Sequence, residues 1–228
     1  MQPEKQKSPT NGPKEKFAVS ITRQSRNEII EIAGQYPLLE LRLDLMRVDL
    51  EELGALFQQN TLVVTFRSGH TSDERRMEAL QQAMEMGAAY CDVDIANPPG
   101  FIREVRRLAR NNGTRLIISS HDFVQTLPAQ DLLAIAHRAV DAGADVVKLV
   151  TSVSQPGDFT QLVSLYKQWG YQAPLIAFGM GQAGKYSRFL PWQYHAPFTY
   201  AAPDETNLAA NGQLSARQME QAYLWFWT

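Results

Sequence analysis

The feature that most constrains the fold of this chain is a regular alternation of strand-like and helix-like segments. Eight short segments have the alternating or β-branched pattern of strands, and each precedes a segment in which apolar residues recur at helical spacing. The expected strands cover residues 17–21, 37–45, 61–67, 89–95, 115–120, 144–150, 173–178 and 197–202. Eight strand–helix units in 228 residues predict an α/β protein with a closed (β/α)8 TIM barrel as its single domain.

An open, doubly wound sheet is the main alternative, because it also alternates strands and helices. Its usual sign is a glycine-rich nucleotide-binding turn after an early strand, and the sequence has none. No linker-like stretch interrupts residues 17–228, which we expect to form the barrel. Residues 1–16 are polar, rich in lysine and proline, and lack the apolar segment of a secretion signal, so we predict a disordered leader.

The composition argues against several classes of partner. The 22 basic and 24 acidic side chains give a net charge of −2, and no basic run of the kind that binds nucleic acid or lipid headgroups stands out. No apolar run reaches the length of a membrane span. We therefore expect a cytoplasmic protein that has a small-molecule substrate and no nucleic-acid or membrane partner.

Residues that commonly bind metals are sparse. Cys91 is the single cysteine, so neither an intrachain disulfide nor a cysteine-based metal site can form. The four histidines lack the HxH or HExxH spacing of metal sites, and we predict no metal. The glycine-rich segment 179–184 has the composition of a phosphate-binding loop but not its Lys-Ser/Thr ending, so we interpret it as a mobile or tightly turned loop.

The second expected strand has one apolar and one charged face. Its leucines occupy every second position, and the residues between them are Glu40, Arg42 and Asp44. A parallel strand covered by helices on both sides would be apolar on both faces. In a barrel the leucines would face the helices and the charged residues would face the lumen. The same parity places Asp92 and Asp94 in the lumen.

The sixth expected strand carries a lysine inside an apolar run. Lys148 shares one face with Val146 and Val150, so it is expected in the lumen. Burial disfavours the charged form of an amine, and the neutral form is a nucleophile that forms imines with carbonyl compounds. Taken alone, such a lysine is more often one that extends its ammonium to solvent at a strand end.

The neighbouring strands change that interpretation. Arg67 and His121 end the third and fifth segments at the carboxyl edge, where barrel enzymes carry their sites. Glu40 and Arg42 converge on the same region, although a purely structural ion pair between these two is an alternative. Converging titratable groups are typical of functional sites. We therefore predict that Lys148 forms an imine and that His121 acts as general acid and base.

Seven short motifs lie in order along nearly the whole chain after residue 16. They are residues 40–44 (ELRLD), 65–68 (TFRS), 92–94 (DVD), 119–123 (SSHDF), 145–148 (DVVK), 179–181 (GMG) with 187–188 (SR), and 212–213 (GQ). Together they resemble type I 3-dehydroquinate dehydratase, the Schiff-base family of the shikimate pathway. The segments around His121 and Lys148 are the most specific.

The resemblance implies a (β/α)8 barrel that works as a homodimer without a metal or an organic cofactor. The implied reaction is the syn dehydration of 3-dehydroquinate to 3-dehydroshikimate. By this similarity Lys148 forms the imine with the C3 ketone, and His121 removes the C2 proton and assists departure of the C1 hydroxyl. Glu40, or a neighbouring acid, would orient His121 or hold substrate hydroxyls. The implied substrate-binding residues are Ser20, Glu40, Arg42, Arg67, Arg188 and Gln213, with Arg188 as the carboxylate clamp.

The chain also departs from the family pattern. Ala209 stands where a serine is often found, Asp94 stands where glutamate is common, and the loop at 69–74 lacks a glycine pair before its acid. Two other functions therefore remain alternatives. One is a different Schiff-base barrel lyase, such as an aldolase acting on another keto acid, and the other is a non-catalytic binding protein that keeps the fold.

Overall fold

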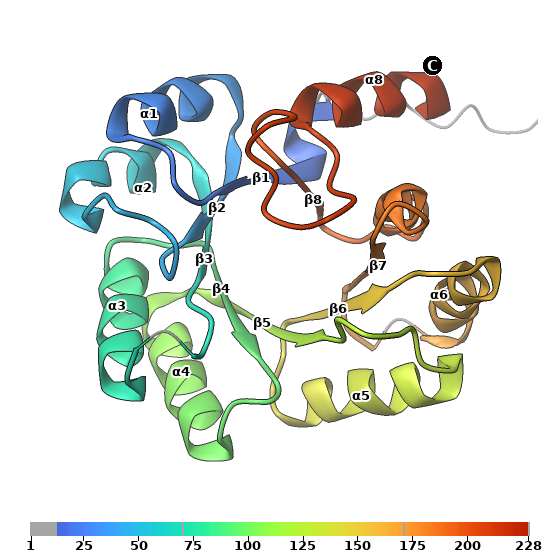
Figure 1. Ribbon diagram of the computed structural model, residues 1–228. Helices are drawn as coiled ribbons and strands as arrows, with labels where there is room; N and C mark the ends of the chain where they lie inside the picture. Colours follow the sequence, from blue (N-terminus) through green and yellow to red (C-terminus); the bar gives the residue numbers. More distant parts are fainter. Residues whose placement is uncertain (1–12, 70, 171, 228) are drawn as a thin grey trace, which may run out of the picture.

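The computed structural model describes residues 13–69, 71–170 and 172–227, which form a nearly closed barrel of eight parallel strands (Figure 1). The strands are β1 (Phe17–Ile21), β2 (Leu38–Arg42), β3 (Thr61–Thr65), β4 (Tyr90–Asp94), β5 (Arg115–His121), β6 (Val146–Ser152), β7 (Leu175–Met180) and β8 (Thr199–Ala201). Their order is β7-β6-β5-β4-β3-β2-β1-β8. The predicted (β/α)8 architecture is confirmed.

The seam of the barrel lies between β7 and β8. Among the described residues no backbone ladder joins these two strands. Instead, the ring of Phe178 on β7 lies 6.1 Å from the ring of Tyr200 on β8. Because β8 is only three residues long, side chains rather than backbone hydrogen bonds close this part of the wall.

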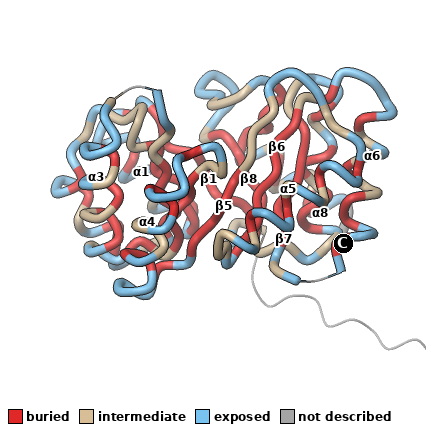
Figure 2. The backbone as a smooth tube through the Cα atoms, turned by 90° about the horizontal axis from the view of Figure 1, so that it is seen from below, coloured by how far each residue is buried: buried red, intermediate tan, exposed pale blue. Residues whose placement is uncertain are grey.

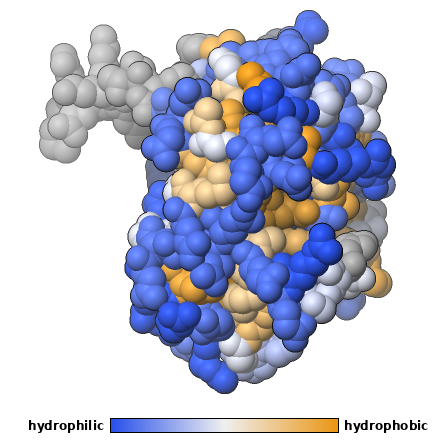
Figure 3. Space-filling model, turned by 90° about the vertical axis from the view of Figure 1, so that its left-hand side faces the viewer, coloured by the Kyte–Doolittle hydropathy of each residue, from blue (hydrophilic) through white to orange (hydrophobic). Residues whose placement is uncertain are grey.

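Helices surround the strands (Figure 1). They are α1 (Arg26–Gln35), α2 (Leu56–Gln59), α3 (Asp73–Glu85), α4 (Pro99–Asn112), α5 (Ala129–Asp141), α6 (Pro156–Gln168), α7 (Leu190–Gln193) and α8 (Ala216–Trp227), with 3-10 helices η1 (Pro13–Lys16), η2 (Leu50–Leu53) and η3 (Lys185–Phe189). On the side that carries α1 to α3, hydrophilic side chains predominate and smaller hydrophobic areas lie between them (Figure 3). None of the described helices has the length and apolar character needed to cross a bilayer.

Two apolar layers follow the alternation along the strands. The outer layer lies between strands and helices and contains Leu39, Cys91 and Val147, whereas the lumen layer contains Tyr90 and Val146. Figure 2 shows the strands as a buried interior inside helices whose outer faces are exposed. The predicted parity of these strands is confirmed, because the two faces of a strand enter two different cores.

The second strand is shorter than predicted. β2 ends at Arg42, because the Arg42 carbonyl accepts hydrogen bonds from the backbone N–H groups of Leu45 and Met46, at 2.9 and 3.0 Å, and so closes a turn. Asp44 therefore does not continue the lumen face. It lies in the turn, and its carboxylate contacts the Arg42 guanidinium.

The start of the chain differs from the prediction in one respect. Residues 1–12 of the predicted leader lie outside the described residues. The last four residues of the leader, Pro13–Lys16, form the 3-10 helix η1. The indole Nε1 of Trp192 donates a hydrogen bond of 2.7 Å to the Lys16 carbonyl, and the Lys14 ammonium lies 5.0 Å from the centre of the Tyr36 ring. These contacts attach residues 13–16 to the barrel, so disorder is the wrong prediction for this segment.

Candidate active site

Lys148 lies inside the barrel between two carboxylates. Its side chain is 4% exposed, and its ammonium Nζ is 2.7 Å from Asp92 Oδ2 and 3.8 Å from Glu40 Oε1. The ring of Tyr200 covers it at 4.0 Å. A buried ammonium is tolerated when carboxylates compensate its charge. The resting lysine is therefore ion-paired, and it must transfer a proton before it can act as a nucleophile.

Asp92 is the principal partner of this lysine. Its Oδ2 contacts Lys148 Nζ, and its Oδ1 accepts a hydrogen bond of 2.6 Å from the Ser119 hydroxyl. Burial raises the pKa of this carboxyl, but the positive charge of Lys148, the electrostatic effect of His121 and the hydrogen bonds from Lys148 and Ser119 hold the pKa below its ordinary value. Asp92 is thus an anion that compensates the charge of the Lys148 ammonium and lies within hydrogen-bond distance of its nitrogen.

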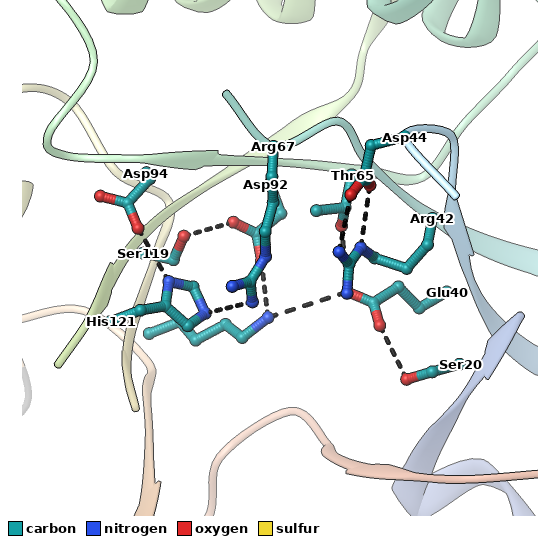
Figure 4. A network of polar contacts seen from close by, with 11 residues as sticks. Ser20, Glu40, Arg42, Asp44, Thr65, Arg67, Asp92, Asp94, Ser119 and His121 are labelled. Atoms are coloured by element: carbon teal, nitrogen blue, oxygen red, sulfur yellow. Dashed lines mark hydrogen bonds and ion pairs between the residues drawn. The ribbon is translucent and has the colours of Figure 1, made fainter. Parts of the chain in front are cut away.

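Glu40 is held by two hydroxyl groups from neighbouring strands. Ser20 on β1 donates a hydrogen bond of 2.7 Å to Oε2, and Thr65 on β3 donates one of 3.0 Å to Oε1 (Figure 4). Arg42, two residues further along β2, forms a bidentate pair with Asp44 at 2.7 and 2.9 Å. A structural Glu40–Arg42 ion pair, which the sequence left as an alternative, does not form. Glu40 is bound by Ser20 and Thr65, and Arg42 is paired with Asp44.

The His121 ring is held between a carboxylate, Asp94, and a guanidinium, Arg67. Its Nδ1 lies 2.8 Å from Asp94 Oδ2, and its Nε2 lies 2.8 Å from an Arg67 guanidinium nitrogen (Figure 4). An arginine only donates and a carboxylate only accepts. The neutral imidazole must therefore carry its proton on Nδ1 and present the Nε2 lone pair to Arg67.

The charge balance around His121 favours the neutral ring. Burial lowers the pKa of His121, and the positive charges of Arg67 and Lys148 lower it further, while Asp94 and Asp92 act in the opposite direction. The net pKa lies below the ordinary value of 6.5. Asp94, not Glu40, is the acid that contacts His121. The expectation named Glu40 or a neighbouring acid as the group that orients the histidine. In the structure the contact is made by the neighbouring acid Asp94, whereas the hydroxyls of Ser20 and Thr65 hold Glu40.

Arg188 is a buried cation at the wall of the same cavity. It follows β7 in η3, is 1% exposed, and donates from Nε to the Gly212 carbonyl at 3.1 Å. Its guanidinium carbon lies 4.6 Å from the centre of the Phe178 ring, and burial lowers its pKa to about 10. Among the described residues no acidic side chain pairs with it. A buried guanidinium in this state is matched to an anionic ligand.

A single cavity connects these groups. Its volume is about 140 Å³. It is lined by Ser20, Glu40, Arg42, Arg67, His121, Phe123, Lys148, Val150, Phe178, Met180, Arg188, Tyr200, Ala209, Ala210 and Gln213. All predicted site residues are thus brought together. Gln213 reaches the cavity, but its side-chain Oε1 also accepts a hydrogen bond of 2.7 Å from the Ala209 backbone, so it holds its own loop.

The glycine-rich segment after β7 is a contact surface for that loop. The Gly181 N–H donates to the Asn211 carbonyl at 3.1 Å, and a Cβ atom on Gly212 would lie 2.1 Å from the Gly181 carbonyl oxygen. Gly212 also has a φ of +73°, in the left-handed region. Two backbones therefore meet at a distance that only glycine permits. The tight-turn interpretation suits this segment better than phosphate binding.

Replacing Gly212 with alanine should displace the loop that carries Ala209, Ala210 and Gln213. We expect KM to rise by about 10-fold or more and the protein to lose about 1–3 kcal/mol of stability, because strain and steric clash coincide. Steady-state kinetics and urea unfolding measure both effects. Gly34→Ala in α1 is the matched control, since a Cβ there meets no atom within 4 Å. Unchanged KM in Gly212→Ala would contradict this account of the loop.

Comparison with known proteins agrees with this arrangement. The family model described as type I 3-dehydroquinase matches residues 17–226. The chain belongs to this family. Among curated relatives, the 3-dehydroquinate dehydratase of Pyrococcus abyssi is 36% identical over 212 residues, covering 89% of this chain and 94% of the relative. That of Thermococcus onnurineus is 33% identical and covers 83% and 87%.

Solved structures share the fold of this type I 3-dehydroquinase. The type I 3-dehydroquinate dehydratase of Clostridium difficile superposes with a TM-score of 0.81 at 21% identity, covering 93% of this chain and 92% of the other. The enzyme from Geobacillus kaustophilus gives a TM-score of 0.80 at 21% identity, covering 94% and 92%. At this level of identity the structures support the fold of the family.

Several site residues of this family member were not predicted to have a role. Asp92 and Asp94 were placed in the lumen by strand parity, but no contact could be assigned to them without the lengths and twists of the strands. Thr65 and Ser119 belong to two of the seven motifs but were given no role of their own, and Tyr200 had no sequence signal. Among the described residues, no group of three or more His, Cys, Asp or Glu side chains is placed to hold a metal ion.

Proposed function

We propose that this chain dehydrates 3-dehydroquinate to 3-dehydroshikimate through an imine on Lys148. Membership of the type I family makes it a hydro-lyase of the shikimate pathway. One observation supports the mechanism most strongly: a buried lysine with a carboxylate 2.7 Å away shares one cavity with a histidine whose neutral tautomer is fixed. A nucleophile beside a proton acceptor, and a base beside an orienting acid, are the parts that imine catalysis needs.

Imine formation begins with a proton transfer. The Lys148 ammonium gives one proton to Asp92, and the resulting amine attacks the C3 carbonyl carbon of the substrate. The carbonyl oxygen takes one proton from the attacking nitrogen and the proton held by Asp92, and leaves as water, so that a C=N bond replaces the C=O bond and Asp92 is again an anion. The protonated imine keeps the positive charge that the ammonium had, and therefore Glu40 and Asp92 continue to balance it.

Elimination then uses His121. Arg67 must release Nε2, after which this nitrogen removes the C2 proton, and the electron pair of the C–H bond moves toward the iminium to give an enamine. The imidazolium forms next to Asp94, which stabilises its charge. The enamine electrons then expel the C1 hydroxyl, which takes the proton from His121 and leaves as water. A second water hydrolyses the resulting imine, which releases 3-dehydroshikimate and restores the Lys148 ammonium. In a syn elimination both groups leave from one face, so one histidine can serve both steps.

Binding of the substrate carboxylate is assigned to Arg188. Its guanidinium is buried in the cavity wall and is not neutralised by an acidic side chain among the described residues. Arg42 and Gln213 line the same cavity and can donate hydrogen bonds to hydroxyl groups of the ligand, whereas Ser20, whose proton goes to Glu40, can accept one. A homodimer and a cytoplasmic location complete the proposal. The homodimer rests on the family resemblance and the location on the composition of the chain, and light scattering measures the mass in solution.

Borohydride trapping tests the mechanism. The protein is incubated with 3-dehydroquinate, sodium borohydride is added, and the modified peptide is identified by mass spectrometry. We expect a reduced adduct on Lys148 together with enone product in the absence of borohydride. An adduct without product would favour another Schiff-base lyase or a binding protein. No adduct at Lys148 would refute the imine mechanism.

The pH dependence of kcat should report the state of His121. The base must be neutral, and its pKa is lowered from 6.5, first by burial and then by Arg67 and Lys148. His121 is therefore protonated at a lower pH than a histidine whose pKa has its ordinary value. We expect the acid limb of the kcat profile to lie below pH 6.5, as measured by initial rates from pH 4 upward. An acid limb above this value would contradict the neutral resting state.

A further inference from the structure

We infer that Arg76, a buried arginine on α3, is a positioning residue for His121. Through Asn97 and Phe66 it is linked to Asp94 and Arg67, the two residues whose side chains contact the imidazole. We call the closed circuit of Arg76, Asn97, Asp94, His121, Arg67 and Phe66 the ring. This inference rests on the proposed role of His121. Arg76 lies outside the cavity and touches neither Lys148 nor His121 among the contacts of the described residues. It therefore acts through other groups.

Arg76 has the surroundings of an interior group. It lies in the first turn of a helix in which charged residues normally face solvent, yet it is only 1% exposed. Its Nη1 donates to Asp73 Oδ1 at 2.6 Å, and its Nη2 donates both to the Phe66 carbonyl at 3.3 Å and to Asn97 Oδ1 at 2.8 Å. The Phe101 ring covers the guanidinium at 4.4 Å. The arginine thus connects α3 to the ends of β3 and β4 and to α4.

One arm of the ring leads to Asp94, the carboxylate that contacts His121 Nδ1. The Asn97 side chain accepts from Arg76 through Oδ1 and donates through Nδ2 to the Asp94 carbonyl at 2.7 Å. Asp94 in turn contacts His121 Nδ1. Arg76 therefore sets the orientation of the Asn97 amide, and that amide fixes the backbone of the residue that orients the imidazole.

The other arm leads to Arg67, the arginine that contacts His121 Nε2. Phe66 and Arg67 follow the last residue of β3, where no strand ladder holds them. The Phe66 carbonyl accepts from Arg76, and the next residue, Arg67, donates to His121 Nε2. Both nitrogens of the imidazole are thus governed by one guanidinium. Phe66, Arg67, Asp94, Asn97 and His121 also line one small cavity of about 10 Å³.

The energetic cost of Arg76 supports a role beyond packing. Removing a guanidinium from water is expensive, and its acidic partner, Asp73, is 51% exposed and so compensates it only in part. Its Nε is buried and has no hydrogen-bond partner among the described residues. An apolar side chain would fill the same space at lower cost. What an apolar side chain cannot do is donate to Phe66 and Asn97 together.

Arg76→Met and Asn97→Asp test the ring at two points. The first removes both arms. The second keeps an acceptor for Arg76 but cannot donate to the Asp94 carbonyl, so it breaks one arm only. Arg107→Met on α4 is the matched control, because Arg107 is exposed and, within the described part of the chain, its ion pair is with Glu104. The readouts are kcat and KM, borohydride trapping at Lys148, and the ¹⁵N NMR shifts of the His121 ring.

In Arg76→Met we expect kcat to fall by about 10- to 100-fold, the scale reported for groups that orient a functional ligand, with KM changed less than threefold. Trapping at Lys148 should persist, and the ¹⁵N shifts should show a mixture of tautomers in place of the Nδ1–H form. Asn97→Asp should show the same tautomer change with a smaller loss of kcat. The control should match the parent protein.

The inference is overturned if either folded variant retains the parent kcat and the Nδ1–H tautomer. If Arg76→Met fails to fold, Asn97→Asp alone decides, because it keeps the acceptor for the buried guanidinium. The tautomer is measured without substrate. A parent protein that has no dehydratase activity would therefore refute the proposed function while the ring remains testable by NMR.

Discussion

Lys148→Ala is expected to abolish turnover, with a loss of about 10⁴-fold or more, because no other group near the cavity centre can form the imine. The adduct found after borohydride reduction should disappear from this peptide. The same change leaves Asp92, which is 2% exposed, without its ammonium partner. Breaking one side of a buried ion pair costs about 3–5 kcal/mol, so this variant should also be less stable.

Two further measurements separate chemistry from folding in Lys148→Ala. Lysine holds the pKa of Asp92 down in the native state, so the pair stabilises the fold above the ordinary carboxyl pKa of 3.8 and this contribution is lost as the pH falls. The stability difference between parent and variant should therefore be largest near neutral pH and should narrow in acid. Lys148→Arg keeps a cation beside Asp92 but provides no imine-forming amine. It should be inactive and more stable than Lys148→Ala, and substantial turnover in either variant would refute Lys148 as the nucleophile.

Strand periodicity explains which parts of the site were predictable. A strand alternates its side chains without exception unless a bulge intervenes, so one apolar face in β2 or β6 determines where Glu40 and Lys148 point. The carboxyl-edge position of His121 followed from the end of β5 in the same way. These residues needed no knowledge of distant contacts. The fold and the centre of the site were therefore accessible from the sequence.

The remaining parts depend on contacts that no local pattern encodes. Arg67 lies two residues beyond the end of β3, where strand alternation no longer fixes the direction of a side chain, and its guanidinium contacts His121. Arg76 lies in a polar helix segment, DERRMEAL, in which an arginine is ordinarily solvent-exposed, yet the approach of α4 buries it. The choice of Asp94 over Glu40 as the partner of the imidazole was set by two hydroxyls on β1 and β3. Each outcome depends on which elements become neighbours in space.

His121→Ala is expected to separate imine formation from elimination. Lys148 and its carboxylates stay in place in this variant, because His121 contacts neither Lys148 nor Asp92 through a hydrogen bond of its own among the described residues. The substrate should therefore still form an imine, although more slowly, and borohydride should still label Lys148.

Turnover of His121→Ala should fall by about 10²–10⁴-fold, the range that general acid–base catalysis contributes, because the proposed mechanism uses His121 as the base for the C2 proton. The acid limb that His121 imposes on the kcat profile should vanish as well. Single-turnover mass spectrometry should show the imine accumulating ahead of product, whereas in the parent protein elimination keeps pace. His137→Ala on α5 is the matched control, since that ring packs on Trp169 at 5.3 Å, on the outside of the barrel. If His121→Ala kept nearly the full rate, another group would have to be the base, and the tautomer fixed by Asp94 would have no role in the reaction.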